Sequence, residues 1–176
     1  MDIEHTGVAG DTGVVRIGTP GRQTSFFAAG IRGATTGVAD AVSVVIDSAG
    51  QLGTINSSRR YKEDIHDMGD ASSGLMKLRP VTFRYSQPYA DGGKPIDYGL
   101  IAEEVEAIYP DLVAHLANGQ METVQYHKVN AMLLNEVQKQ DRAIQALQDQ
   151  VAAQRAEIEL LKVRLDELAH QRTRRP

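Results

Sequence analysis

Residues 57–65 read Ser-Ser-Arg-Arg-Tyr-Lys-Glu-Asp-Ile and lie where the composition of the chain changes. Ten of the sixteen glycines fall in residues 1–53, and none follows Gly119. A Gly-rich, strand-like segment therefore precedes residues 57–65, and a mixed segment that leads into a long helical one follows them. This change predicts an α+β chain of three parts, residues 1–56, 57–127 and 128–172, followed by a disordered basic tail at residues 173–176.

The composition favours a modest core in a protein that associates. Apolar residues make up 41% of the chain, but aromatic residues only 5%, and tryptophan is absent. We therefore do not expect one large core, and association of copies would bury the remaining apolar surface. The net charge of -4, with no basic stripe outside the C-terminal tail, argues against nucleic acid as a partner.

Several other classes of protein do not fit this sequence. Cysteine is absent, so disulfides and thiolate metal sites are excluded. The five histidines are scattered without the spacing of metal ligands, and we expect no metal or cofactor. No apolar run is long enough to cross a membrane, and the N-terminus has neither the basic nor the apolar region of a signal peptide.

The first segment, residues 1–56, is predicted to form short strands separated by glycines. Clusters of β-branched and aromatic residues fall at 13–18, 25–31 and 42–47, and a turn is expected at 47–50. Such strands are too few to close a sandwich alone, so their edges need partners. Three identical chains wound into a β-prism or triple β-helix would supply them; a disordered Gly-rich linker is the alternative.

The middle segment, residues 57–127, is predicted to be a small mixed fold. A short helix over 70–78 would have Asp70 as its N-cap, and we interpret Ser72 and Ser73, near Lys77, as capping and solvating residues. The other expected elements are strands at 81–85 and 98–101, a helix at about 102–108, and a hairpin of 112–115 with 122–126 across Asn118-Gly119.

The chain is predicted to be helical from about Lys128 and to carry a continuous heptad repeat. The a positions are Asn130, Val137, Ile144, Val151, Ile158 and Leu165, and the d positions are Leu133, Gln140, Leu147, Gln154, Leu161 and Leu168. Such a register predicts a left-handed coiled coil. Glutamine in two d layers leaves the number of strands open. A single amphipathic helix packed on its own domain is the alternative.

Ser57 and Lys62 are the candidate catalytic residues. A serine can cut a peptide bond with a neutral lysine as general base, and positive neighbours such as Arg59 and Arg60 disfavour the charged form of a lysine. Five residues of extended chain would separate the pair by roughly 17 Å, and in a helix the two would lie on different faces. The segment must therefore bend back, or Ser57 must meet Lys62 of a neighbouring chain.

Four blocks, in this order, resemble a known family. They are residues 57–65, residues 75–85 (Leu-Met-Lys-Leu-Arg-Pro-Val-Thr-Phe-Arg-Tyr), residues 98–105 (Tyr-Gly-Leu-Ile-Ala-Glu-Glu-Val) with Tyr109-Pro110, and Val124-Gln125-Tyr126. The set, which covers about residues 57–150, resembles the intramolecular chaperone domain at the C-terminus of phage endosialidase tailspikes. That domain also occurs in other tail fibres and in a membrane-bound eukaryotic transcription factor.

The resemblance implies a domain that trimerises the β-rich fibre preceding it and then cuts itself off through a Ser-Lys dyad. Ser57 would be the nucleophile and Lys62 the general base, while Arg60 would position the turn or the oxyanion. The scissile bond would adjoin Ser57, at Asn56–Ser57 in our interpretation. The family has Asp after the leading Ser, whereas this chain has Ser58.

The partners implied by the resemblance are two further copies of the chain, giving a trimeric coiled coil, and the upstream fibre segment of the same chain. The protein would belong to a virion tail fibre, or would be a phage-derived bacterial protein. The alternative is a structural domain that trimerises a phage-derived or surface adhesin and stays attached. Chaperoning requires only the fold and the trimer, so it does not depend on cleavage.

Overall fold

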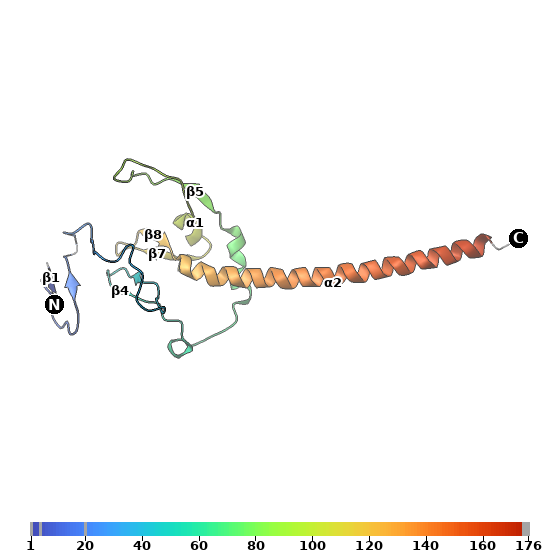
Figure 1. The fold of residues 1–176 in the computed structure, drawn as a ribbon, viewed down its shortest axis with the longest axis horizontal. Helices are drawn as coiled ribbons and strands as arrows, with labels where there is room; N and C mark the ends of the chain where they lie inside the picture. The colour runs from blue at the N-terminus through green and yellow to red at the C-terminus, as the bar shows by residue number, and fades with distance from the viewer. Residues whose placement is uncertain (1, 4, 20, 174–176) are drawn as a thin grey trace. The chain divides into compact units, whose positions relative to one another are not determined.

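The computed structural model describes residues 2–3, 5–19 and 21–173 (Figure 1). Contacts divide the chain into two compact units, Met1–Ser43 and Val44–Pro176. The break thus precedes the change of composition at residue 57. Except for Thr173, the predicted basic tail lies outside the described residues.

The first unit holds little regular structure. Strand β1 (Asp2–Ile3) pairs in parallel with β2 (Arg16–Ile17), so the strand predicted over 13–18 is reduced to two residues. The strand predicted over 25–31 does not form. Phe27 is 91% exposed, and no neighbouring strand supplies hydrogen-bond partners to this stretch of a single chain.

The second unit begins with a hairpin. Strands β3 (Val45–Ile46) and β4 (Leu52–Gly53) are antiparallel. Asp47 closes the turn between them, since its Oδ1 accepts hydrogen bonds from Ala49 N at 3.0 Å and Gln51 N at 2.9 Å. Gly50 supplies the left-handed conformation, with φ of 83°. The turn predicted at 47–50 is confirmed.

The mixed middle segment has the predicted order of elements. They are the 3-10 helices η1 (Arg59–Tyr61) and η2 (Gly69–Lys77), the antiparallel strands β5 (Val81–Phe83) and β6 (Asp97–Gly99), helix α1 (Ala102–Glu106), the 3-10 helix η3 (Pro110–Leu112), and the antiparallel strands β7 (Val113–His115) and β8 (Met121–Val124). The predicted hairpin over Asn118-Gly119 is therefore confirmed. Each two-stranded sheet needs packing from neighbouring elements, because an isolated hairpin is marginal in water.

Helix η2 departs from the prediction at its start. It begins at Gly69, its N-cap is Met68, and Asp70 lies within its first turn. The prediction of Asp70 as the N-cap is therefore wrong. The Asp70 carboxylate instead accepts a hydrogen bond from Lys139 Nζ, at 3.1 Å, which draws it away from the backbone N–H groups of its own helix.

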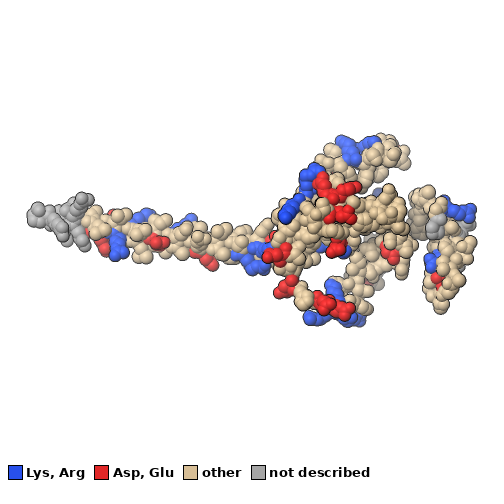
Figure 2. Space-filling view, turned by 180° about the vertical axis from the view of Figure 1, so that it is seen from behind, with Lys and Arg blue, Asp and Glu red and all other residues tan. Residues whose placement is uncertain are grey.

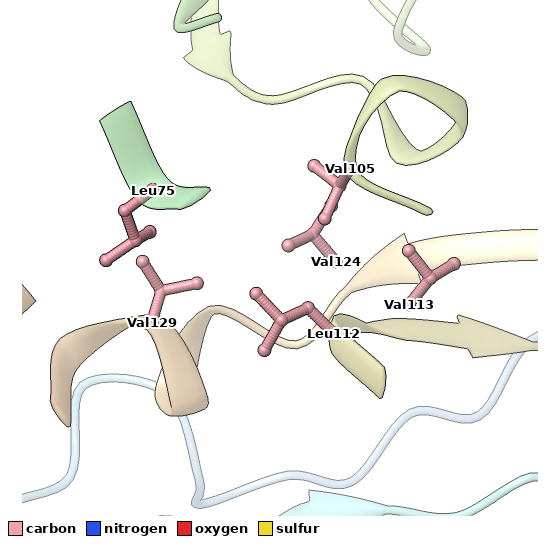
Figure 3. Close-up of a cluster of buried hydrophobic side chains, with 6 residues drawn as sticks. All are labelled: Leu75, Val105, Leu112, Val113, Val124 and Val129. Carbon is pink, nitrogen blue, oxygen red and sulfur yellow. The ribbon is translucent and has the colours of Figure 1, made fainter. Parts of the chain in front are cut away.

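The core of the second unit is small and gathers one residue from each of six elements. Leu75 of η2, Val105 of α1, Leu112 of η3, Val113 of β7, Val124 of β8 and Val129 of the long helix are all buried and point toward one another (Figure 3). Val105 is only 1% exposed. These contacts, more than strand pairing, hold the short elements together, since burying each such side chain contributes about 1.5–3 kcal/mol.

Helix α2 (Tyr126–Thr173) is continuous and begins two residues before its predicted start (Figure 1). Its first part packs on the middle segment through Val129, Met132, Asn135, Glu136 and Lys139. None of residues 141–170 is buried. Lys, Arg, Asp and Glu are interspersed along this helix on the face shown in Figure 2. Within the described residues, no helix has the length and apolar character needed to cross a membrane.

Candidate active site

A tight turn brings Ser57 and Lys62 together in one chain. Helix η1 forms because Tyr61 N donates to Ser58 O and Lys62 N donates to Arg59 O, each at 3.0 Å. This single 3-10 turn reverses the chain after Ser57. Lys62 Nζ consequently donates a hydrogen bond to Ser57 Oγ at 3.2 Å. Of the two arrangements left open by the spacing, the structure contains the one in which the segment bends back on itself.

Arg60 contacts the turn itself. Its guanidinium carbon lies 4.7 Å from the centre of the Tyr61 ring, which is the geometry of a cation–π contact. The turn is followed by Asp64, whose φ of 51° is the left-handed conformation that aspartate tolerates better than most residues. Ser58, the residue before η1, makes no side-chain cap hydrogen bond to that helix.

The site is open to solvent. Asn56, Ser57, Arg60 and Lys62 are all exposed, as are their neighbours from residue 51 to residue 67. A hydroxyl and an amine at this distance can act as nucleophile and base, because proton transfer needs a contact of about 2.6–3.2 Å. Ser57 Oγ and Lys62 Nζ therefore lie within hydrogen-bonding distance of each other, next to the Asn56–Ser57 bond.

A second Ser-Lys contact lies elsewhere and has a different electrostatic setting. Lys139 Nζ lies 2.9 Å from Ser73 Oγ, so Ser73 contacts this lysine rather than Lys77. The same ammonium lies 3.1 Å from both Glu136 Oε1 and Asp70 Oδ1. These hydrogen bonds, that of Glu136 first, raise the pKa of Lys139. Lys139 thus keeps its proton and is unsuited to act as a base.

No pattern in the sequence pointed to the buried part of this second cluster. Ser72 is fully buried, and its Oγ donates to Glu136 Oε1 at 2.6 Å. Its partners Asn135 and Glu136 are 63 and 64 residues away along the chain. Both lie outside the a and d positions of the heptad repeat, so the periodic pattern offered no way of pairing them with Ser72.

Two acidic residues of α1 contact side chains outside the helix. Glu104 accepts a bidentate hydrogen bond from Arg79, at 3.1 Å for Arg79 Nε, and this contact raises the pKa of Arg79. Glu106 Oε1 lies 2.8 Å from His115 Nε2. Among the described residues, no group of three or more His, Cys, Asp or Glu side chains is arranged to hold a metal ion.

Comparison with known proteins identifies the segment that carries the dyad. Residues 57–114 match the sequence model of the family described as chaperone of endosialidase. The match begins at Ser57 and includes Lys62, the 3-10 helices η1, η2 and η3, and the β5–β6 hairpin. A search of curated proteins found no match to the chain. Residues 57–114 therefore form a chaperone of endosialidase domain.

Proposed function

We propose that this chain is a homotrimeric intramolecular chaperone that assembles the β-rich fibre segment preceding residue 57 and releases itself by cutting its backbone next to Ser57. The observation that carries the proposal is the contact of Lys62 Nζ with Ser57 Oγ, at 3.2 Å, at the start of a chaperone of endosialidase domain. A Ser-Lys contact elsewhere would have little weight, as the one between Ser73 and Lys139 illustrates.

In the proposed reaction, Ser57 Oγ attacks the carbonyl carbon of Asn56. Neutral Lys62 takes the hydroxyl proton and then gives it to the Ser57 nitrogen as the Asn56–Ser57 C–N bond breaks. The Asn56 acyl group is thereby moved from the Ser57 nitrogen to Ser57 Oγ as an ester. Water hydrolyses this ester, which leaves the Asn56 carboxylate on one fragment and a free Ser57 amine and hydroxyl on the other.

Helix α2 packs on the domain with one face and presents its apolar a and d residues elsewhere, an arrangement that supports the proposed trimeric coiled coil. The face that packs on the domain uses Val129, Met132, Asn135, Glu136 and Lys139, at heptad positions c, f and g. The apolar a and d residues lie elsewhere on the helix, and from Leu133 onward they are exposed in a single chain; they are Leu133, Val137, Ile144, Leu147, Val151, Ile158, Leu161, Leu165 and Leu168. Domain packing therefore leaves the seam free for other copies.

The Gly-rich segment supports the role of fibre end. Its strands are two residues long, and its large apolar side chains are exposed, among them Phe26, Phe27, Ile31, Val38 and Val42. A single chain offers these residues no core. Three copies aligned by α2 would let the edges pair and the apolar side chains pack, which is the work of an assembly chaperone.

Intact mass together with sedimentation tests the proposal. The purified chain should yield two fragments, residues 1–56 and 57–176, and should sediment as a trimer. A full-length trimer would instead support the alternative, a structural trimerisation domain of a phage-derived or surface adhesin that stays attached. A monomer at micromolar concentration would contradict both functions.

A further inference from the structure

A polar cluster joins η2 to α2 on the side of the helix away from its a and d positions. We call it the clasp; its members are Asp70 and Ser72 of η2 with Asn135, Glu136 and Lys139 of α2. Ser72 Oγ donates to Glu136 Oε1 and accepts from Asn135 Nδ2, each at 2.6 Å. Asn135 Nδ2 also donates to Gly69 O at 2.8 Å. Lys139 bridges Glu136 and Asp70, at 3.1 Å each.

Burial makes the clasp specific. Ser72 is 0% exposed and Glu136 only 8% exposed, although the surrounding core is small. A buried carboxylate is tolerated only with hydrogen-bond or charge partners, and here a hydroxyl and an ammonium supply them. Sliding or rotating η2 along α2 would separate Glu136 from the Ser72 hydroxyl and Lys139 from the Asp70 carboxylate. The clasp therefore permits one relative placement of the two helices.

The position of the clasp along the chain gives it a second consequence. Among the described residues, no hydrogen bond links residues 54–67 to another element. Met68 O then accepts a hydrogen bond from Ala71 N of η2, and the first bond after the dyad that reaches α2 is the one from Asn135 Nδ2 to Gly69 O. On α2 the clasp is also the last packed part, since none of residues 141–170 is buried. It thus lies between the segment that bears Ser57 and Lys62 and the helix that bears the apolar seam.

We propose that the clasp makes self-cleavage depend on α2, by anchoring the chain that follows the dyad to the helix through which the copies associate. This inference rests on the proposed function and assigns positioning roles to Ser72, Glu136 and Lys139. The clasp residues do not touch the reacting atoms. Their effect is to hold η2, and with it the end of the dyad segment, in one place relative to α2.

Matched pairs on α2 itself test the inference in the full chain. Glu136 with Lys139 and Glu159 with Lys162 are both i,i+3 ion pairs, but only the first reaches across to η2. Glu136→Gln and Lys139→Ala should slow appearance of the 57–176 fragment about tenfold while the protein still sediments as a trimer. Glu159→Gln and Lys162→Ala should cleave at the unaltered rate.

Hydrogen exchange separates loss of the clasp from general unfolding. In trimeric Glu136→Gln, faster amide exchange should be confined to η2 and the residues just before it, while β7 and β8 keep their protection. Asp70→Asn, at an exposed position, should slow cleavage by a smaller factor without impairing folding. Clasp variants that form trimers and cleave at the unaltered rate would overturn the inference, as would equal slowing by Lys162→Ala. Absence of cleavage in the unaltered chain would instead contradict the proposed function.

Discussion

Lys62 Nζ and Ser57 Oγ lie 3.2 Å apart because the three residues of η1 reverse the chain between them. The contact is local, and it forms in a segment that is exposed throughout. The reacting groups are therefore brought together by backbone geometry rather than by a preformed pocket. Five expected outcomes follow from this site and the domain around it.

Removing either member of the dyad should leave the chain uncut. Ser57→Ala removes the nucleophile, and Lys62→Ala or Lys62→Met removes the base, whose loss should cost about a hundredfold or more in rate. A denaturing gel and intact mass report the fragments. Lys77→Ala, at an exposed position, is the control and should cleave as before. Cleavage of Ser57→Ala at the same bond would show that another residue is the nucleophile.

Arg60 should matter through its contact with the Tyr61 ring. An exposed cation–π contact is worth about 0.5–1 kcal/mol, so Arg60→Ala should loosen the turn and slow cleavage severalfold. Tyr61→Phe keeps an aromatic face and should retain the rate, whereas Tyr61→Ala should lose as much as Arg60→Ala. Arg59→Ala is the neighbouring control. A far larger loss for Arg60→Ala than for Tyr61→Ala would indicate instead that Arg60 acts on the oxyanion.

Replacing Gly99 with a larger residue should destabilise the fold, because the Tyr126 side chain lies directly against the Gly99 backbone. A Cβ at position 99 would lie 2.7 Å from Tyr126 Oη, which accepts a hydrogen bond from Leu100 N at 2.9 Å. Gly99→Ala should cost about 1–3 kcal/mol of unfolding free energy, measured by denaturant titration. Gly37→Ala, with no atom within 4 Å of its Cβ, should change little. Combining Tyr126→Phe with Gly99→Ala should recover part of the lost unfolding free energy. If the effects of the two substitutions simply add in the double variant, the proposed clash is contradicted.

Adjacent leucines should separate the coiled-coil seam from the rest of the helix surface. Leu160 and Leu161 are both exposed in a single chain, at 73% and 53%, but only Leu161 is at a d position. Leu161→Asp places three carboxylates at the axis of the proposed trimer and should dissociate it. Leu160→Asp should sediment as the parent does. Equal behaviour of the two variants would argue against this seam.

Glu136 should make stability depend on acid pH. Hydrogen bonds from Ser72, first, and then from Lys139 lower the pKa of Glu136 below its ordinary value of 4.5. Because the folded pKa is depressed, this stabilisation is complete above the unfolded value and disappears as pH falls through the folded one. The difference in Tm between the parent and Glu136→Gln should therefore be constant above about pH 5 and shrink below it. Glu159→Gln should show the same dependence of Tm on pH as the parent. A Tm curve for Glu136→Gln that runs parallel to that of the parent at every pH would refute the role assigned to the Glu136 carboxylate.

Much of the fold was predictable because its signals are local. The Asn118-Gly119 turn, the alternation around β5 and the unbroken helical run from residue 128 each depend on neighbouring residues, and all three are confirmed. The strand over 25–31 was not confirmed, since no described strand pairs with this stretch of the chain. The prediction of Asp70 as an N-cap was wrong for a related reason. The Asp70 carboxylate accepts a hydrogen bond from Lys139, which is 69 residues away along the chain.

By itself, the sequence determined the family of residues 57–114, the identity of the candidate dyad and the periodicity of the long helix. All three are written in residue types and spacings along the chain. The tertiary structure decided how Ser57 reaches Lys62, and which of two Ser-Lys contacts is free of carboxylates among the described residues. It also decided that Ser72 of η2 donates a hydrogen bond to the buried Glu136 of α2. The physical reason is that hydrogen bonds and charge partners act over distances in space, and residues 64 positions apart become neighbours only when the chain has folded.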